Sequence, residues 1–346
     1  MKIDVNKYKS YYFETALKIF NTPSPTGYYR EIEGVLASYA KELGVDFQRT
    51  NKGCFILTLP GKRREALGLA AHADTLGAMV RSISSNGLRF SKLGGPVLST
   101  FDGEYCTIIT RDGKKYSGTF LSVNPSKHVY ADSDTLARTE ETMYVRLDET
   151  VKNADEIKNL GIQVGDYIAI DPKTTVTESG FLKSRFIDDK ASVVALLTVL
   201  KILKDHNITP EYTVKMVITM YEEVGHGASF IPSDIIKMLC VDMGCIGKDL
   251  TCNEHQVSIC AKDSGGPYDY DFTTEIINLA KANNIDFAVD VYPYYGSDLG
   301  AMWRAGYDIP GALIGTGVHA SHGMERTHFD GIANTISLIL LYLSVN

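Results

Sequence analysis

The stretch Ala66-Leu-Gly-Leu-Ala-Ala-His72-Ala-Asp74-Thr-Leu-Gly77 decides the fold of this 346-residue chain. Its first six residues lack charge, as expected of a strand that is buried on both faces of a sheet. The strand runs directly into a polar group that contains His72 and Asp74. Because open α/β sheets place their chemistry at the carboxyl ends of strands, this pattern predicts an α/β fold with a functional site here.

Helical and strand patterns alternate on both sides of this stretch. Apolar residues recur at helical spacing near the N-terminus, and the same alternation returns in the second half of the chain. The expected helices are residues 8–19, 28–43, about 190–205 and about 332–345, and the expected strands are 54–59, 66–71 and 213–220. The chain is therefore predicted to build one α/β domain from two separated segments.

The region between these segments has a different character. Short β-rich runs at 105–110, 119–123, 143–147 and 167–170 are separated by Gly, Asn and Asp turns. This pattern predicts an inserted all-β domain, a small barrel, over residues 79–172. The α/β domain then consists of residues 1–78 and 173–346.

Charge and composition exclude several classes of partner. The 35 Lys and Arg residues against 42 Asp and Glu residues give a net charge of -7, which disfavours nucleic acid and anionic membranes as partners. No stretch approaches the roughly 20 apolar residues that span a bilayer, so we expect a cytoplasmic protein. The six cysteines form no Cys-x-x-Cys pair and are expected to be reduced, mostly buried thiols.

Five polar groups that follow or interrupt apolar segments carry the candidate chemistry. They are His72-Ala-Asp74, Asp188-Asp189-Lys190, Glu222-Glu223, Val241-Asp242-Met243 and His319-Ala-Ser-His322-Gly-Met-Glu325. Taken singly, the first is typical of a surface turn and the second of a helix N-cap. Glu222-Glu223 is more informative, because two adjacent acids after a strongly apolar strand repel each other unless cations compensate. Together the groups supply the imidazole and carboxylate ligands of a dinuclear metal hydrolase.

The order of these motifs carries a family resemblance. The strings HAD, DDK, EEVG, VDMG, YGSDLGA and HASHGMERTH resemble the family that contains tetrahedral and glutamyl aminopeptidases, some members of which have been described as cellulases. The resemblance extends from about His72 to the C-terminus and includes the β insertion. It implies a three-layer α/β sandwich with a mixed central sheet, of the dinuclear zinc-peptidase type, interrupted by a small β-barrel that serves assembly.

The resemblance also implies roles for individual residues. His72 binds one metal ion, Asp188 bridges both ions, Glu223 joins the ion of His72, and Asp242 binds one ion of the pair. Glu222 is the general base. A further implication is a cis peptide bond between Asp188 and Asp189.

The last ligand requires a choice between two histidines. Counting from Pro310, as the family pattern suggests, selects His322 as the metal ligand and leaves His319 as a substrate contact. This string departs from the family pattern, because Gly323 follows His322 and Glu325 lies three positions on rather than four.

Two further acids have both a functional and a structural interpretation. Asp74 belongs to the catalytic group if it fixes the orientation of the His72 imidazole, and it otherwise caps a turn. Asp298 resembles a family residue that orients a ligand or meets the substrate, and a Gly-rich turn with an Asx hydrogen bond explains it equally well.

The resemblance implies an aminopeptidase that uses two divalent ions, zinc or cobalt, acts on peptides, and forms a dimer-based homo-oligomer or a dodecamer. Two alternatives stay open: a related deacylase or dipeptidase, and a catalytically silent binding module. The remaining histidines are not expected to bind metal, because none has a second ligand at a useful spacing: His128, His206, His226, His255 and His328.

Overall fold

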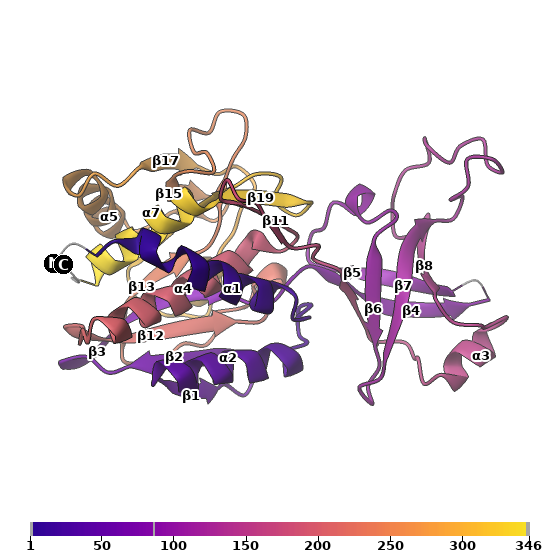
Figure 1. Ribbon diagram of the computed structural model, residues 1–346, viewed down its shortest axis with the longest axis horizontal. Helices are drawn as coiled ribbons and strands as arrows, with labels where there is room; N and C mark the ends of the chain where they lie inside the picture. The colour runs from indigo at the N-terminus through magenta and orange to yellow at the C-terminus, as the bar shows by residue number, and fades with distance from the viewer. Residues whose placement is uncertain (1–2, 86, 344–346) are drawn as a thin grey trace. The chain divides into compact units, whose positions relative to one another are not determined.

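The computed structural model describes residues 3–85 and 87–343, and the chain divides into two compact units. Unit 1 consists of Met1–Asp74 and Lys173–Asn346, and unit 2 consists of Thr75–Pro172 (Figure 1). The first strand of unit 2, β4 (Gly77–Ser84), begins two residues before residue 79, where the sequence pattern places the start of the inserted domain.

Unit 1 is built on a mixed ten-stranded sheet of the described residues. Its order is β1 (Asp46–Arg49), β2 (Phe55–Leu59), β12 (Tyr212–Thr219), β3 (Arg63–His72), β13 (Ile235–Val241), β18 (Gly311–Val318), β15 (Val257–Asp263) and β16 (Gly266–Pro267), with β14 (Gly244–Cys245) beside β18 and β17 (Phe287–Val291) beside β15. Strands β12, β3, β13 and β18 are parallel, whereas β2 and β15 flank them antiparallel. The carboxyl ends of four parallel strands therefore meet at one edge.

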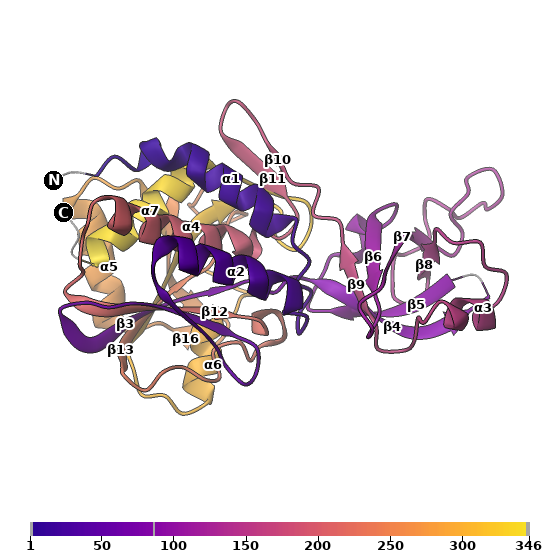
Figure 2. The same cartoon turned by 60° about the horizontal axis from the view of Figure 1, so that its bottom comes forward.

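The two faces of this sheet bury different side chains. Along β3, Leu67, Leu69 and Ala71 belong to one apolar cluster, and Ala66 and Ala70 to another, as the two-residue period of a strand requires. The first face is covered by α1 (Lys9–Phe20), α2 (Arg30–Leu43), α4 (Ile187–Asp205), α5 (Tyr270–Ala282) and α7 (Phe329–Tyr342). The second carries the short helix α6 (Asp298–Arg304) and connecting loops (Figure 2).

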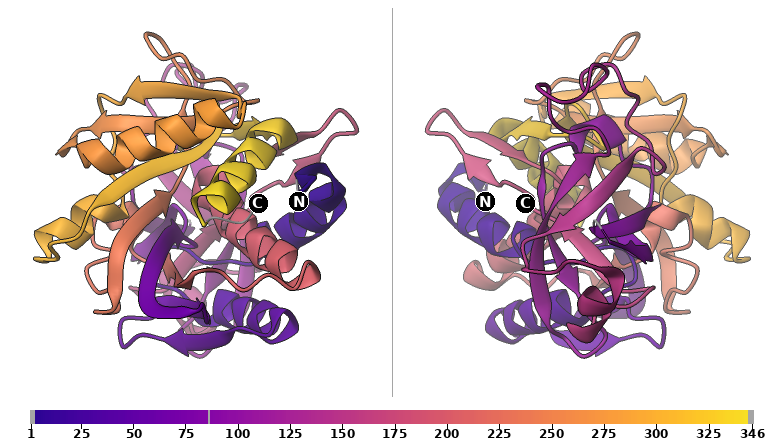
Figure 3. Two further views of the ribbon diagram at one scale, coloured as in Figure 1. Left: turned by 90° about the vertical axis from the view of Figure 1, so that its left-hand side faces the viewer. Right: turned by 90° about the vertical axis from the view of Figure 1, so that its right-hand side faces the viewer.

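Helix α4 is the centre of the helical layer. It packs against both α1 and α7 (Figure 3). Its side chains are buried along nearly its whole length. Asp188 and Asp189 lie in its first turn but have non-helical backbone angles, so regular helix begins at Lys190, where the sequence pattern places it. The peptide bond between the two acids is cis, as the resemblance implied.

The last helix and a small second sheet complete unit 1. Helix α7 begins at Phe329, three residues earlier than expected, and residues 344 and 345 of the expected helix lie outside the described residues. Strands β10 (Thr175–Val176), β11 (Phe181–Ser184) and β19 (Glu325–His328) form a three-stranded antiparallel sheet. Within residues 3–85 and 87–343, no helix combines the length and apolar character needed to cross a bilayer.

Unit 2 is a closed antiparallel barrel. Its strand order is β4 (Gly77–Ser84), β5 (Gly87–Leu93), β8 (Met143–Leu147), β7 (Lys115–Ser122), β6 (Tyr105–Ile109) and β9 (Tyr167–Ile170), and α3 (Ala154–Asn159) lies in the connection before β9. Phe90 and Phe120 are fully buried and pack edge to face, with ring centroids 5.0 Å apart. The expected fold, an α/β sandwich with a mixed sheet interrupted by a small β-barrel, is confirmed.

Candidate metal centre

His72 ends β3, the central parallel strand, and its ring is 1% exposed. Its Nδ1 lies 3.0 Å from the backbone carbonyl oxygen of Asp74 and 3.6 Å from the Asp74 carboxylate. The closer partner is thus the carbonyl, which can only accept a hydrogen bond and so assigns the proton to Nδ1. Nε2 then carries the lone pair, and it faces the other acids of the centre.

Asp188 lies between two imidazoles. Its Oδ1 is 3.1 Å from Nε2 of His72, and its Oδ2 is 3.5 Å from Nε2 of His322. A carboxylate with one oxygen toward each of two ligand groups has the arrangement that a bridge between two cations requires.

The Glu222-Glu223 turn, which forms the 3-10 helix η3 (Glu222–Val224), is held in place by Asp74. The backbone N–H groups of Glu222 and Glu223 donate to the two oxygens of Asp74 at 3.2 and 3.3 Å, and the Thr26 hydroxyl donates to the same carboxylate at 2.8 Å. Asp74 therefore orients the imidazole of His72 chiefly through its backbone, while its carboxylate fixes the two glutamates.

The two glutamates face different neighbours. Glu223 Oε2 lies 3.7 Å from Nε2 of His322, and Glu222 Oε2 lies 3.7 Å from Nε2 of His72. The side chain of Glu223 is 3% exposed and that of Glu222 is 15% exposed. Ligand atoms of His72, Asp188 and Glu223 also lie within 4.8 Å of one another, so Glu223 is within reach of both imidazoles.

Asp242 and Asp189 form a second group of possible ligands with His72. Ligand atoms of these three buried residues lie within 4.8 Å of one another. Asp242 directly follows β13, and its Oδ1 accepts a hydrogen bond from its neighbour Met243 at 2.6 Å. Asp189 Oδ2 accepts from the His72 backbone at 3.1 Å. The sequence pattern assigned no separate role to Asp189. Its position next to Asp188 was the signal that could have identified it as a possible ligand.

Glu325, to which the sequence pattern assigned no role, holds two parts of the centre together. Its side chain, 1% exposed, accepts hydrogen bonds from the backbone N–H of Asp188 and from that of His322, both at 3.0 Å. It joins β19 to the start of α4. The loop that it holds places His322 at a positive φ of 63°.

The electrostatics of the centre are dominated by buried negative charge. Burial, together with neighbouring carboxylates, raises the pKa of Glu222 and of Glu223 well above the usual range and the pKa of Asp242 to about 7. Burial lowers the pKa of His72, but Asp188, Glu222 and other acids outweigh this and raise it. For Asp188, burial raises the pKa, but hydrogen bonds to both imidazoles outweigh it and hold the pKa below its usual value. Such a site favours cations.

Unsatisfied oxygens indicate where those cations fit. Oε1 of Glu223 and Oδ1 of Asp189 are buried and have no hydrogen-bond partner among the described residues. A buried carboxylate oxygen without a donor is costly unless a cation compensates it. Imidazole nitrogens with carboxylate oxygens are the donor set of zinc and related divalent ions. The residues of this centre therefore fit a divalent metal.

The two residues expected to contact the substrate, His319 and Asp298, differ in exposure. His319 is exposed, and its backbone pairs with Arg326 in an isolated β-bridge. Asp298 is 2% exposed, and its oxygens accept hydrogen bonds from the Thr219 hydroxyl at 2.6 Å and the Ala228 backbone at 2.7 Å. Asp298 thus ties the end of β12 to the loop that follows the glutamate turn.

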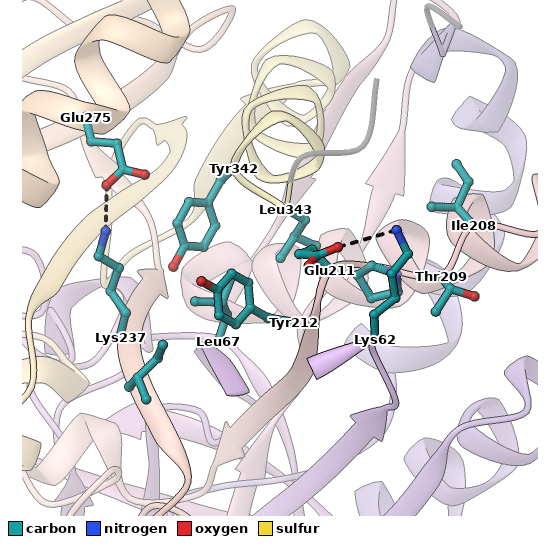
Figure 4. A pocket seen from close by; sticks show the side chains of 12 residues that line it. Lys62, Leu67, Ile208, Thr209, Glu211, Tyr212, Lys237, Glu275, Tyr342 and Leu343 are labelled. Carbon is teal, nitrogen blue, oxygen red and sulfur yellow. Dashed lines mark hydrogen bonds and ion pairs between the residues drawn. The ribbon is translucent and has the colours of Figure 1, made fainter. Parts of the chain in front are cut away.

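A cavity of about 500 Å³ lies elsewhere in unit 1, and none of the expected site residues lines it. Its wall carries two ion pairs, Lys62 with Glu211 at 3.4 Å and Lys237 with Glu275 at 2.6 Å, beside the ring of Tyr342 (Figure 4). Because its charged side chains already pair with one another, this cavity offers no ligand set for a cation.

The chain is similar to several known proteins in sequence and in fold. A model of the M42 glutamyl aminopeptidase family matches residues 53–338. The protein YhfE of Bacillus subtilis (strain 168) is 42% identical over 334 residues, which cover 95% of this chain and 96% of YhfE. The TET aminopeptidase of Thaumarchaeota archaeon SCGC AB-539-E09 has a TM-score of 0.87 at 20% identity, covering 96% of each chain. The TET1 peptidase of Pyrococcus horikoshii has a TM-score of 0.82 at 22% identity, covering 95% of this chain and 98% of its own.

Proposed function

This chain belongs to the M42 glutamyl aminopeptidase family and is a peptide hydrolase, and from that premise we propose a mechanism with two divalent metal ions and a glutamate base. The observation that carries the proposal is the position of Asp188, whose oxygens face one imidazole each. His72 and Asp242 would hold one ion, and Glu223 and His322 the other, with Asp188 between them. In this proposal Glu223 shares an ion with His322, because its Oε2 lies 3.7 Å from Nε2 of His322. The resemblance had implied that Glu223 shares the ion of His72.

The metal ions, zinc or cobalt, would supply Lewis acidity that polarises the peptide carbonyl and acidifies a water molecule. Glu222 accepts the proton of the attacking water and returns it to the leaving amine. Its side chain is more exposed than that of Glu223, which leaves it accessible to a substrate. Asp74 accepts a hydrogen bond from the backbone N–H of Glu222 and so fixes the turn that orients the Glu222 side chain.

Substrate choice tests this function directly. The purified protein is stripped with a chelator, reloaded with zinc, cobalt or manganese, and offered aminoacyl anilides with free amines beside N-acylated amino acids. Metal-dependent hydrolysis of the free-amine substrates is the expected result. Hydrolysis of only the acylated compounds would instead identify a deacylase, and no hydrolysis in a protein that retains no metal would indicate a silent binding module.

We also propose that the chain self-associates through unit 2. The TET1 peptidase of Pyrococcus horikoshii can assemble into a tetrahedron or a large octahedral shell. On unit 2 of this chain, Tyr105, Val129 and Val164 are each at least 64% exposed, which leaves apolar surface for a partner copy. Size-exclusion chromatography with light scattering should give a mass of at least two chains, and a monomer at all concentrations would contradict this. The cytoplasmic location stays a prediction.

A further inference from the structure

A second group of metal-ligating side chains lies outside the candidate metal centre. His255 precedes β15, His328 ends β19, and Asp330 belongs to the first turn of α7. Oδ2 of Asp330 is 2.9 Å from Nδ1 of His255 and 3.1 Å from Nδ1 of His328. We propose that these three side chains bind one divalent transition-metal ion, such as zinc, in addition to the ions of the proposed catalytic centre.

The alternation of side chains along β19 separates this group from the catalytic centre. Glu325 points toward Asp188, to whose backbone it is hydrogen-bonded. Successive side chains of a strand point to opposite faces, so Arg326 and His328 lie on the face opposite to Glu325. The proposed site therefore shares a strand with the catalytic centre but not a face.

The hydrogen bonds of His328 prepare its ring for a metal. Nε2 lies 2.7 Å from the backbone carbonyl oxygen of Ser179, which can only accept, so the proton is on Nε2 and the lone pair on Nδ1. Metal-bound histidines usually donate their other ring N–H to a carbonyl or a carboxylate in this way. The backbone N–H of Asp330 now donates to Nδ1 at 3.1 Å and caps α7, and a metal ion would take its place.

The spacing of the ligand atoms suits a small cation. With metal–ligand bonds near 2.0–2.1 Å, neighbouring ligands of a tetrahedral zinc site lie about 3.3 Å apart. The observed 2.9 and 3.1 Å need only a slight opening. The side chains of His255 and Asp330 are 46% and 56% exposed, which leaves room for a water molecule as a further ligand. Arg326, whose guanidinium lies 4.9 Å from the ring centroid of Phe181, is already paired with Glu254 at 2.6 Å.

The group is held in place by contacts that do not involve the ligand atoms. Phe181 of β11 pairs directly with His328 and packs edge to face against both imidazoles, with centroids 4.8 Å from His328 and 5.9 Å from His255. The backbone N–H of His255 donates to Asn253, and its carbonyl accepts from Asn334 of α7. Because these contacts fix both rings, binding an ion would order few additional groups.

The test counts zinc ions on the full-length protein. Wild-type protein, His255→Ala and Asp330→Asn are dialysed against zinc and analysed by elemental mass spectrometry, with His128→Ala, an exposed histidine of unit 2, as the matched control. Wild type and His128→Ala should hold about one ion more per chain than the other two variants, while all four hydrolyse anilides equally. Equal zinc contents in all four proteins would overturn the proposal.

A second measurement needs no variant. Cobalt is first added to wild-type protein until the rate of anilide hydrolysis no longer increases. Copper(II) is then titrated into the same sample, and the electron paramagnetic resonance spectrum is recorded. A spectrum with hyperfine coupling to two nitrogens, at about one copper per chain and without loss of activity, is expected. Copper that binds only as activity is lost, by displacing cobalt, would contradict a separate site.

Discussion

At the scale of single residues, Asp74 connects the histidine of the metal centre with its two glutamates. Its backbone carbonyl faces His72, and its carboxylate accepts hydrogen bonds from two backbone N–H groups and from Thr26. A buried carboxylate with three donors is well satisfied, and hydrogen bonds to a charged group are stronger than neutral ones. The position of Glu222 therefore depends on a side chain that does not itself need to touch substrate.

We predict that Asp74→Asn separates metal binding from turnover. Asparagine keeps the backbone carbonyl that orients His72, but it turns an N–H group toward one of the two backbone donors of the glutamate turn. The free energy of unfolding should fall by about 1–3 kcal/mol, as for a lost buried hydrogen bond. Anilide turnover should fall at least about tenfold. Denaturant titration, metal analysis and initial rates measure these effects, with the exposed Asp46→Asn as control. Unchanged turnover would contradict the assigned role.

At the scale of elements, the centre exists because four parallel strands end together. Strands β12, β3, β13 and β18 each lead into a segment that supplies part of the donor set, and the start of α4 adds Asp188 and Asp189. The fit between β13 and β18 is especially close at Gly315. A Cβ atom placed on Gly315 would lie 1.3 Å from the carbonyl oxygen of Asp242.

Gly315→Ala is therefore expected to push β18 away from Asp242 or to prevent native packing. We predict that the free energy of unfolding falls by roughly 2–4 kcal/mol, in the range of severe core overpacking, and that bound metal is lost. Gly34→Ala is the matched control, because Gly34 is exposed in the middle of α2 with no atom within 4 Å of its added Cβ. The free energy of unfolding of the Gly34→Ala variant should rise by about 0.5–1 kcal/mol, because alanine is the better helix former. Thermal unfolding compares the two, and equal stability of both variants would show that the close approach is unimportant.

At the scale of the whole molecule, the buried acids make stability depend on pH and on metal. In the metal-free protein the pKa of Asp242 is raised to about 7 and that of Glu325 to about 8, mainly by burial. Between pH 5 and 7 the folded state thus holds protons that the unfolded state has released, so unfolding becomes easier as pH rises. Lys190, whose pKa burial lowers to about 7, keeps its proton in both states over most of this range and does not reverse the trend.

The prediction is a melting temperature for the metal-free protein that falls by roughly 5 °C from pH 5 to pH 7. Protein saturated with zinc or cobalt should show a smaller fall or a rise, since divalent cations compensate the carboxylates. Differential scanning calorimetry of both forms measures the difference. A metal-free protein that becomes more stable over this interval would be inconsistent with the raised pKa values.

Much of this architecture could be predicted from the sequence, because apolar runs report burial. The run at 66–71 located the central strand, although β3 begins at Arg63, since the exposed residues Arg63–Glu65 carry no apolar signal. The family resemblance is confirmed by the match over residues 53–338. The structure also brings together the residues that the motifs named as metal ligands.

Features that depend on backbone direction or on distant pairing could not be predicted. Glu325 acts through the N–H groups of Asp188 and His322, and sequence does not show where such groups point. His255 and His328 had no local partner in the sequence, yet the packing of α7 against the strand layer brings their ring centroids within 4.2 Å.

The most direct test of the two-metal centre with a glutamate base measures bound metal and turnover on the same sample of Glu222→Gln. The account predicts that this variant retains both ions, while anilide hydrolysis falls by about 10²- to 10⁴-fold, the usual contribution of a general base. Glu223→Gln, its neighbour in the same turn, should instead lose metal. A Glu222→Gln protein with both ions and a rate near that of the wild type would contradict the central claim.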